Sequence, residues 1–144
     1  MSLTSLSPRE ASIFACATDV IVSPEPLLPA VHETDAVAAF DRWLARSPAL
    51  NRLGLRALLY AIELSPWLAG ERRRLRRLDR TERSEALREA ERAGPALWRA
   101  LFKVVKGLCT ICYYGDLQVM RRLGYDAEAN AARGRELRAR EGRP

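Results

Sequence analysis

Four Ser-Pro pairs divide the first half of the chain, and they constrain its fold more than any other feature. Their serines are Ser7, Ser23, Ser47 and Ser65. Proline is accepted in the first turn of a helix but breaks a helix interior, and a serine before it can cap the helix. The strongest case is Ser7-Pro8-Arg9-Glu10, because Glu10 stands three residues after the serine, as a capping box requires. We interpret three of the pairs, at Ser7, Ser47 and Ser65, as helix starts.

Between these breaks the apolar residues recur at helical spacing, and the composition agrees. Ala, Leu, Arg and Glu, all good helix formers, dominate the 144 residues. A proline-rich connector, SPEPLLP at 23–29, separates the first two helices. The sequence therefore predicts an all-α fold, a single compact bundle of about six or seven helices. We expect a helical domain over 1–126, followed by a polar, Arg- and Glu-rich tail over 127–144 that is either helical or frayed.

Seven helices are expected along this domain. The first two cover 8–22 and 33–46, and the third begins after Pro48 and carries Leu55, Leu58, Leu59 and Ile62. The fourth covers 67–78, and the fifth is capped by Thr81. The last two cover 96–114 and 117–123. In the second of them Val37, Phe40 and Leu44 form the face to be buried. Gly94-Pro95 ends the fifth helix and opens the longest one, and Gly124 ends the last.

The longest predicted helix contains a CxxC motif, made by Cys109 and Cys112. Both cysteines lie on or beside one apolar stripe, formed with Leu97, Leu101, Val104, Val105, Leu108 and Ile111. A redox-active CxxC usually lies at a helix N-terminus, where the dipole lowers the thiol pKa. Here it lies near the C-terminal end, where the dipole opposes a thiolate. We therefore predict that both are core cysteines on the buried face of this helix.

No catalytic or metal-binding constellation is recognisable in the sequence. A zinc site needs four ligands, and the chain has three cysteines and one histidine, His32, far apart. His32 has no nucleophile and carboxylate in a triad pattern, and the glycines are too isolated for a phosphate loop. We expect His32 at the surface or near the N-cap of a helix, no catalytic residue, and no metal or cofactor held by this chain itself.

Positive charge is concentrated in the Arg72–Arg77 cluster, which holds five arginines. The whole chain has a net charge of +6, and all its basic residues except two lysines are Arg. Excess positive charge permits nucleic-acid binding without showing it, and no aromatic residue is interleaved with the cluster. A solvated or acidic-partner surface is the favoured interpretation, and a nucleic-acid-binding helical regulator that uses this cluster is the alternative.

Two adjacent tyrosines, Tyr113 and Tyr114, end the longest predicted helix. Neighbouring residues on a helix point about 100° apart, so the two rings cannot both face the core. At least one of them should lie near the rim, where tyrosine suits a protein interface.

Three stretches of the chain together resemble a known family. They are GLRALLYAIE at 54–63, the Pro66-Trp67-Leu68 that follows, and YYGDLQVMRRLGYD at 113–126. With the first helix and its proline connector, they make the chain from Ser7 to Asp126 similar to the gluconate 2-dehydrogenase subunit 3 family. The terminal tyrosine-containing stretch is the sharpest part of the resemblance.

The resemblance implies a non-catalytic accessory subunit. Members of that family are small helical subunits that bind flavin-dependent dehydrogenases of the glucose–methanol–choline type and support their maturation or export. FAD and the catalytic groups would then belong to the large subunit, the expected partner of this chain. The expected interface residues are Trp67, Tyr113, Tyr114, Leu123 and Tyr125. A small enzyme or ligand-binding helical bundle is a third hypothesis.

The expected location is cytoplasmic. The first residues, MSLTSLSPRE, show neither a charged segment followed by an apolar one nor a twin arginine. Many members of the family carry a twin-arginine signal, so the resemblance implies a cytoplasmic partner here, or one that brings its own signal. The most apolar segments are short and are interrupted by Asp19 and Lys106, so no membrane span is expected.

Overall fold

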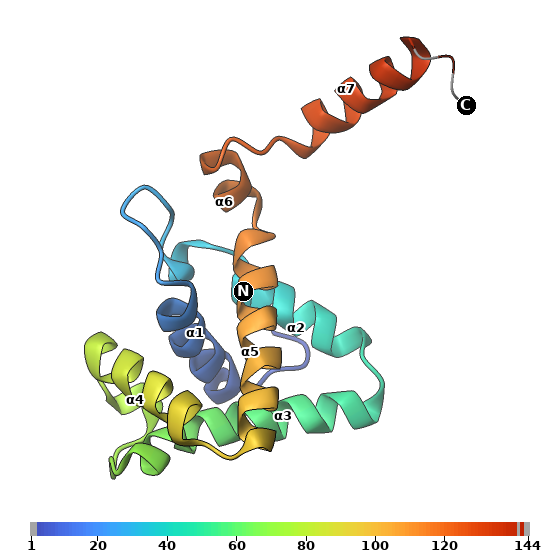
Figure 1. Ribbon diagram of the computed structural model, residues 1–144. Helices are drawn as coiled ribbons and strands as arrows, with labels where there is room; N and C mark the ends of the chain where they lie inside the picture. Colours follow the sequence, from blue (N-terminus) through green and yellow to red (C-terminus); the bar gives the residue numbers. More distant parts are fainter. Residues whose placement is uncertain (1–2, 141, 143–144) are drawn as a thin grey trace.

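Helix α1 (Pro8–Val22) packs against most of the other helices, and α5 (Ala96–Tyr114) runs beside it along the length of the molecule (Figure 1). The computed structural model describes residues 3–140 and 142, apart from the side chains of residues 68, 69 and 127. The other α-helices are α2 (Ala36–Arg46), α3 (Ala49–Leu64), α4 (Arg80–Ala93), α6 (Leu117–Arg122) and α7 (Ala127–Arg140). Three short 3₁₀ helices are η1 (Val31–Glu33), η2 (Ser65–Ala69) and η3 (Leu75–Arg77). These described residues contain no strand, and the predicted all-α fold is confirmed.

The predicted start of α1 is confirmed in detail. The Ser7 hydroxyl accepts the Glu10 N–H at 3.2 Å, and the Glu10 carboxylate accepts the Ser7 N–H at 2.8 Å. This reciprocal pair satisfies two donors at the helix start. The helix ends at Val22, as expected, and the next residue, Ser23, takes a left-handed conformation with φ 42°.

The other two serines interpreted as caps do not cap a helix start. The Ser47 hydroxyl donates back to the Trp43 carbonyl at 3.0 Å, and the Ser65 hydroxyl donates to the Ile62 carbonyl at 2.8 Å. Each serine thus satisfies a carbonyl at the end of the preceding helix. Helix α3 still begins directly after Pro48, without a side-chain cap.

The prediction of a helix over 67–78 is wrong. The chain forms only η2, turns at Gly70 in the left-handed region with φ +82°, and reaches η3 through irregular structure. Leu75 is completely buried, and the Arg76 guanidinium pairs with the buried carboxylate of Glu63 at 2.9 Å. A solvated arginine-rich helix would be stabilised only by helix propensity. The observed path is favoured over it because it buries Leu75 and gives the buried carboxylate of Glu63 a partner.

Two predicted helix starts are shifted. Helix α2 begins at Ala36 rather than residue 33, because η1 is a separate turn and Thr34 after it is extended. Helix α4 is capped by Asp79 rather than Thr81. The Asp79 carboxylate accepts the Glu82 N–H at 2.8 Å, and the Glu82 carboxylate accepts the Asp79 N–H at 2.9 Å. The acidic residue at the third helical position therefore identifies Asp79 as the cap. The bounds of α5 are those expected.

The core is built from apolar and aromatic side chains of α1 to α5. Phe14 on α1 stacks on Phe40 on α2, with ring centroids 4.2 Å apart. The other buried members of this cluster are Leu6, Ile13, Ala17, Leu44, Leu58, Leu59, Ile62, Leu75, Leu87, Ala90, Trp98, Phe102, Val105 and Cys109. Among the residues predicted for the α2 face, Phe40 and Leu44 are buried and Val37 is partly buried. A smaller second cluster is formed by Val31, Ala36, Tyr113 and Val119.

Helix α7 projects away from the other helices (Figure 1). The described side chains of this helix are exposed almost throughout, including Leu137. The sequence predicts a tail that is either helical or frayed, and the structure has a helix over 127–140. Because its sequence is polar on all sides, it has no apolar face to bury. None of the helices in the described part of the chain is both long and apolar enough to cross a membrane.

Candidate functional site: an exposed apolar face and a polar groove

One side of α5 is both apolar and exposed. We call it the α5 face and define it by Leu97, Leu101, Val104 and Ile111. Leu97 and Ile111 are 72% and 71% exposed, and Val104 is 50% exposed. All four lie on one side of the helix, and Leu108, between them in the row, is half-buried. Exposed apolar patches are found at contacts with proteins, membranes or ligands, so the α5 face is a candidate for such a contact.

The α5 face corrects the prediction that the whole CxxC stripe is buried. Val105 of this stripe and Cys109 beside it are buried, as predicted, and the other residues of α5 that face the core are Trp98, Phe102 and Tyr113. Apolar residues occupy more than half of the circumference of this helix, so the sequence offers two apolar faces, either of which could pack against the core. The aromatic face packs inward, and the aliphatic face remains in solvent.

The charges on α5 are all of one sign. The helix contains no acidic residue, and its basic residues are Arg99, Lys103 and Lys106. Lys106 is paired with Glu91 at 2.6 Å, and Lys103 is exposed. None of the three basic residues stands three or four positions from a residue of the α5 face, so they lie on another side of the helix.

A second exposed apolar row follows α3. It is formed by Leu50, Leu53, Tyr60 and Leu64 and continues into Trp67 on η2. The guanidinium of Arg9 lies over the Tyr60 ring, 5.3 Å from its centroid. Helix α3 buries Leu58, Leu59 and Ile62 on its other side, as the sequence predicts for these three residues.

Tyr113 corrects the predicted partner interface. Its side chain is completely buried, and its hydroxyl donates to the Pro29 carbonyl at 2.7 Å. It is therefore a core residue that fixes the proline connector, and it cannot contact a partner in this conformation. Tyr114 is 37% exposed and packs edge-on against Tyr113, with ring centroids 5.1 Å apart. The prediction that the two tyrosines divide between core and rim is confirmed.

The other predicted interface residues are exposed but do not form one surface. Leu123 and Tyr125 lie at the end of α6, 56% and 51% exposed. Trp67 is also exposed, but it belongs to η2, which packs against α3 and α4, whereas α6 packs against α5. These elements lie at opposite ends of the molecule (Figure 1). The sequence shows the residues of the α5 face as one apolar stripe but predicts that the stripe is buried, and only the structure shows that these residues are exposed.

The CxxC cysteines are held as protonated thiols. Cys109 is completely buried, and burial raises the pKa of its thiol to about 12. Cys112 is partly buried, and burial raises its pKa to about 11, against a smaller opposing effect of the Arg42 charge. The prediction of a core cysteine is confirmed for Cys109, and Cys112 lies at the edge of the core.

The remaining candidates do not assemble around a common point. His32 is exposed on η1, as predicted. In residues 3–140, no three His, Cys, Asp or Glu side chains are arranged to hold a metal ion. Within the Arg72–Arg77 cluster, Arg73 pairs with Glu82 at 2.6 Å and Arg76 with Glu63. The cluster is thus partly neutralised by the protein itself.

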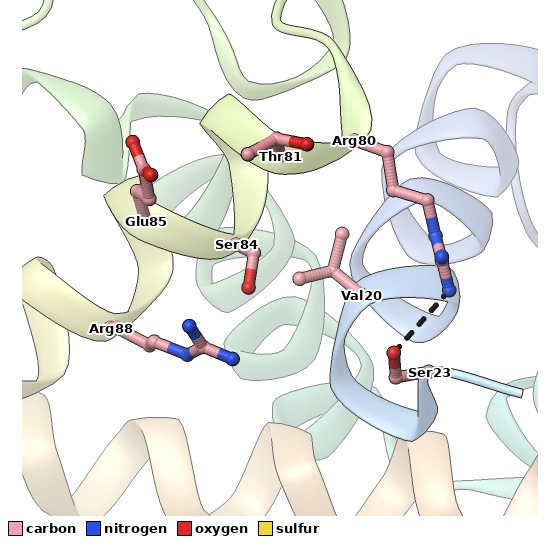
Figure 2. A pocket seen from close by; sticks show the side chains of 7 residues that line it. All are labelled: Val20, Ser23, Arg80, Thr81, Ser84, Glu85 and Arg88. Carbon is pink, nitrogen blue, oxygen red and sulfur yellow. Dashed lines mark hydrogen bonds between the residues drawn. The ribbon is translucent and has the colours of Figure 1, made fainter.

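A polar groove lies between the end of α1 and the start of α4, and Figure 2 shows it from close by. We call it the α1–α4 groove. It encloses about 240 Å³ and is lined by Val20, Ser23, Arg80, Thr81, Ser84, Glu85 and Arg88. Arg80 spans its edge, with its Nε 3.0 Å from Asp19 and its Nη2 3.4 Å from the Ser23 hydroxyl.

Comparison with known proteins adds no assignment. A scan against models of protein families, a search of the curated proteins and a search of the solved structures found no match to this chain.

Proposed function

We propose that this chain is a non-catalytic accessory subunit that binds and stabilises, or matures, the large subunit of a flavin-dependent oxidoreductase of the glucose–methanol–choline type. The observation that carries the binding role is the α5 face. Complete burial of an aliphatic side chain is worth about 1.5–3 kcal/mol, and this face leaves Leu97 and Ile111 more than two-thirds exposed. A partner that covers the face would recover much of this free energy.

The composition of the α5 face defines the partner's chemistry. Because its four side chains are aliphatic, the complementary surface has an apolar centre. A second copy of this chain would bring together two molecules that each carry a net charge of +6. We therefore favour a different protein as the partner.

The flavoprotein identity of the partner rests on the resemblance of 7–126 to the accessory-subunit family. In that arrangement FAD and the reacting groups belong to the large subunit, and this chain contributes a docking surface. The protonated thiols of Cys109 and Cys112 suit a binding role better than a redox role.

Co-expression with the flavin-dependent dehydrogenase encoded nearest to this chain tests the proposal. We expect the two proteins to co-purify, and we expect Leu97→Asp to reduce co-purification by about tenfold or more. Leu137→Asp is the matched control, because it makes the same change at an exposed leucine of α7. The proposal is wrong if the large subunit folds, loads FAD and is fully active without this chain.

A further inference from the structure

The α1–α4 groove is rich in hydrogen-bond donors that converge from two helices. Ser23 contributes a hydroxyl from the end of α1, and α4 contributes the hydroxyls of Thr81 and Ser84 and the guanidinium groups of Arg80 and Arg88. A guanidinium can only donate, and a hydroxyl can donate to an acceptor that enters the groove. The site is therefore suited to a ligand that carries several acceptor oxygens.

The charge of the groove is centred on Arg88. Arg80 is largely neutralised, because its Nε is bound to the Asp19 carboxylate. The ion pairs that α4 forms among the described residues use Arg80, Glu82, Glu89, Glu91 and Arg92, and Arg88 takes part in none of them. The one carboxylate among the lining residues, Glu85, points away from the guanidinium of Arg88, which is directed toward Ser84 and Val20 (Figure 2). The groove thus presents one guanidinium that is not ion-paired beside hydroxyl groups, with the Glu85 carboxylate as the opposing charge in its lining.

The size of the groove limits the ligand. Its 240 Å³ lies below the range of about 300–1,000 Å³ that is usual for organic cofactors and drug-sized ligands. An adjoining hollow of about 220 Å³ shares Val20, Ser23, Ser84 and Arg88, and it adds Ile21, Leu87, Phe102 and the ion pair of Glu91 with Lys106. A small oxyanion can therefore lie against Arg88, with room for an organic group beside it.

We propose that the α1–α4 groove binds a phosphate group, as inorganic phosphate or a small phosphate ester. The Arg88 guanidinium supplies a planar fork of donors that fits two phosphate oxygens. Ser84, one turn earlier on α4, supplies a hydroxyl to a third oxygen, and Ser23 and Arg80 form the opposite wall. This site is separate from the α5 face, so it does not depend on the proposed partner.

Titration of inorganic phosphate into the ¹⁵N-labelled chain tests the proposal, at constant ionic strength maintained with sodium chloride. We expect saturable shifts of the Ser84 and Arg88 amide signals. We expect Arg88→Gln to weaken binding about tenfold or more, because a hydrogen bond to a charged group is lost. Arg92→Gln is the matched control and should change binding less than about twofold, because Arg92 lies one turn further along α4 and pairs with Glu89.

Three results would overturn the proposal. They are equal weakening by Arg88→Gln and Arg92→Gln, shifts that do not saturate, and saturation of the same signals by acetate at the same concentration. A parallel titration with phenyl phosphate identifies the source of the phosphate group. Tighter binding of the ester supports a phosphate ester whose organic part occupies the adjoining hollow, and equal or weaker binding supports inorganic phosphate.

Discussion

The carboxylate of Asp41 on α2 accepts a hydrogen bond of 2.7 Å from the backbone N–H of Leu6, 35 positions earlier in the chain. The same carboxylate accepts the N–H groups of Thr4 and Ser5 and the Thr4 hydroxyl, at 2.8–2.9 Å. Asp41 is only 3% exposed. It therefore anchors the segment before α1 against α2 and places Ser7 where it caps α1.

Asp41→Asn should destabilise the protein. The substitution removes the charge from four hydrogen bonds and directs an amide donor toward backbone donors. We expect the free energy of unfolding to fall by about 2 kcal/mol, measured by urea denaturation. Asp35→Asn, at the residue directly before α2, is the control: Asp35 is exposed, makes no side-chain cap to the helix, and its pair with Arg42 is long, at 3.8 Å. It should cost less than about 0.5 kcal/mol, and equal losses in the two variants would contradict this role.

The anchor should also make stability depend on pH. Burial acts to raise the pKa of Asp41, but the hydrogen bonds from Thr4, Leu6 and Ser5 outweigh it and lower the pKa from 3.8 to about 2. A carboxyl with a lowered folded-state pKa contributes stability that is complete above its unfolded-state pKa. This contribution is lost as the pH falls from about 4 through about 2. The stability difference between wild type and Asp41→Asn should therefore shrink over that interval, and a constant difference would contradict the assignment.

Two glycines of the α4–α5 region should respond in opposite ways to alanine. A Cβ on Gly94 would lie 2.3 Å from the Trp98 side chain and 2.5 Å from the Ala90 carbonyl oxygen, whereas a Cβ on Gly107 would meet nothing within 4 Å. Gly94→Ala should therefore destabilise the protein, and thermal unfolding would show a lower Tm. Gly107→Ala should stabilise α5 by about 0.5–1 kcal/mol, because alanine favours a helix interior. A higher Tm for Gly94→Ala would show that the turn adapts.

The elements predicted correctly are those whose signals are local. The Ser7–Glu10 capping box and the Gly94-Pro95 break each determine a helix end through contacts within a few residues. The failure over 67–78 has a non-local cause. Helix propensity alone does not show that Glu63, 13 positions before Arg76, is buried and binds it, or that Leu75 enters the core.

The candidate sites were less predictable than the fold, also for a physical reason. Helical periodicity shows which residues share a face, but α5 has two apolar faces, and only tertiary packing selects the one that faces α1. The sequence likewise predicts Tyr113 at the interface, whereas its side chain lies in the core. The α1–α4 groove has no sequence signature, because Ser23 and Arg88 come together only through the packing of α1 against α4.

Tyr113 and Tyr114 should have separable roles. Tyr113→Phe removes the hydroxyl that donates to Pro29 and leaves that carbonyl without this partner. We expect a loss of about 1 kcal/mol in the free energy of unfolding. Tyr114→Phe should change stability by less than about 0.5 kcal/mol, because Tyr114 is partly exposed. If the two variants unfold at the same urea concentration, the Tyr113 hydroxyl does not secure the connector.

Cys109 should be nearly inert in the folded protein. The thiolate is the reactive form of cysteine, and burial raises the pKa of Cys109 to about 12 and of Cys112 to about 11. Two variants that each retain one of these cysteines, with the others changed to alanine, allow their rates to be compared with a thiol-specific disulfide reagent at pH 8. Cys112 should react faster than Cys109, because it is only partly buried. Cys109 should react at the rate at which the core opens, and urea should bring both thiols to the same fast rate. Rapid reaction of Cys109 without urea would show that its thiol is accessible and would contradict the conclusion that the CxxC has no chemical role.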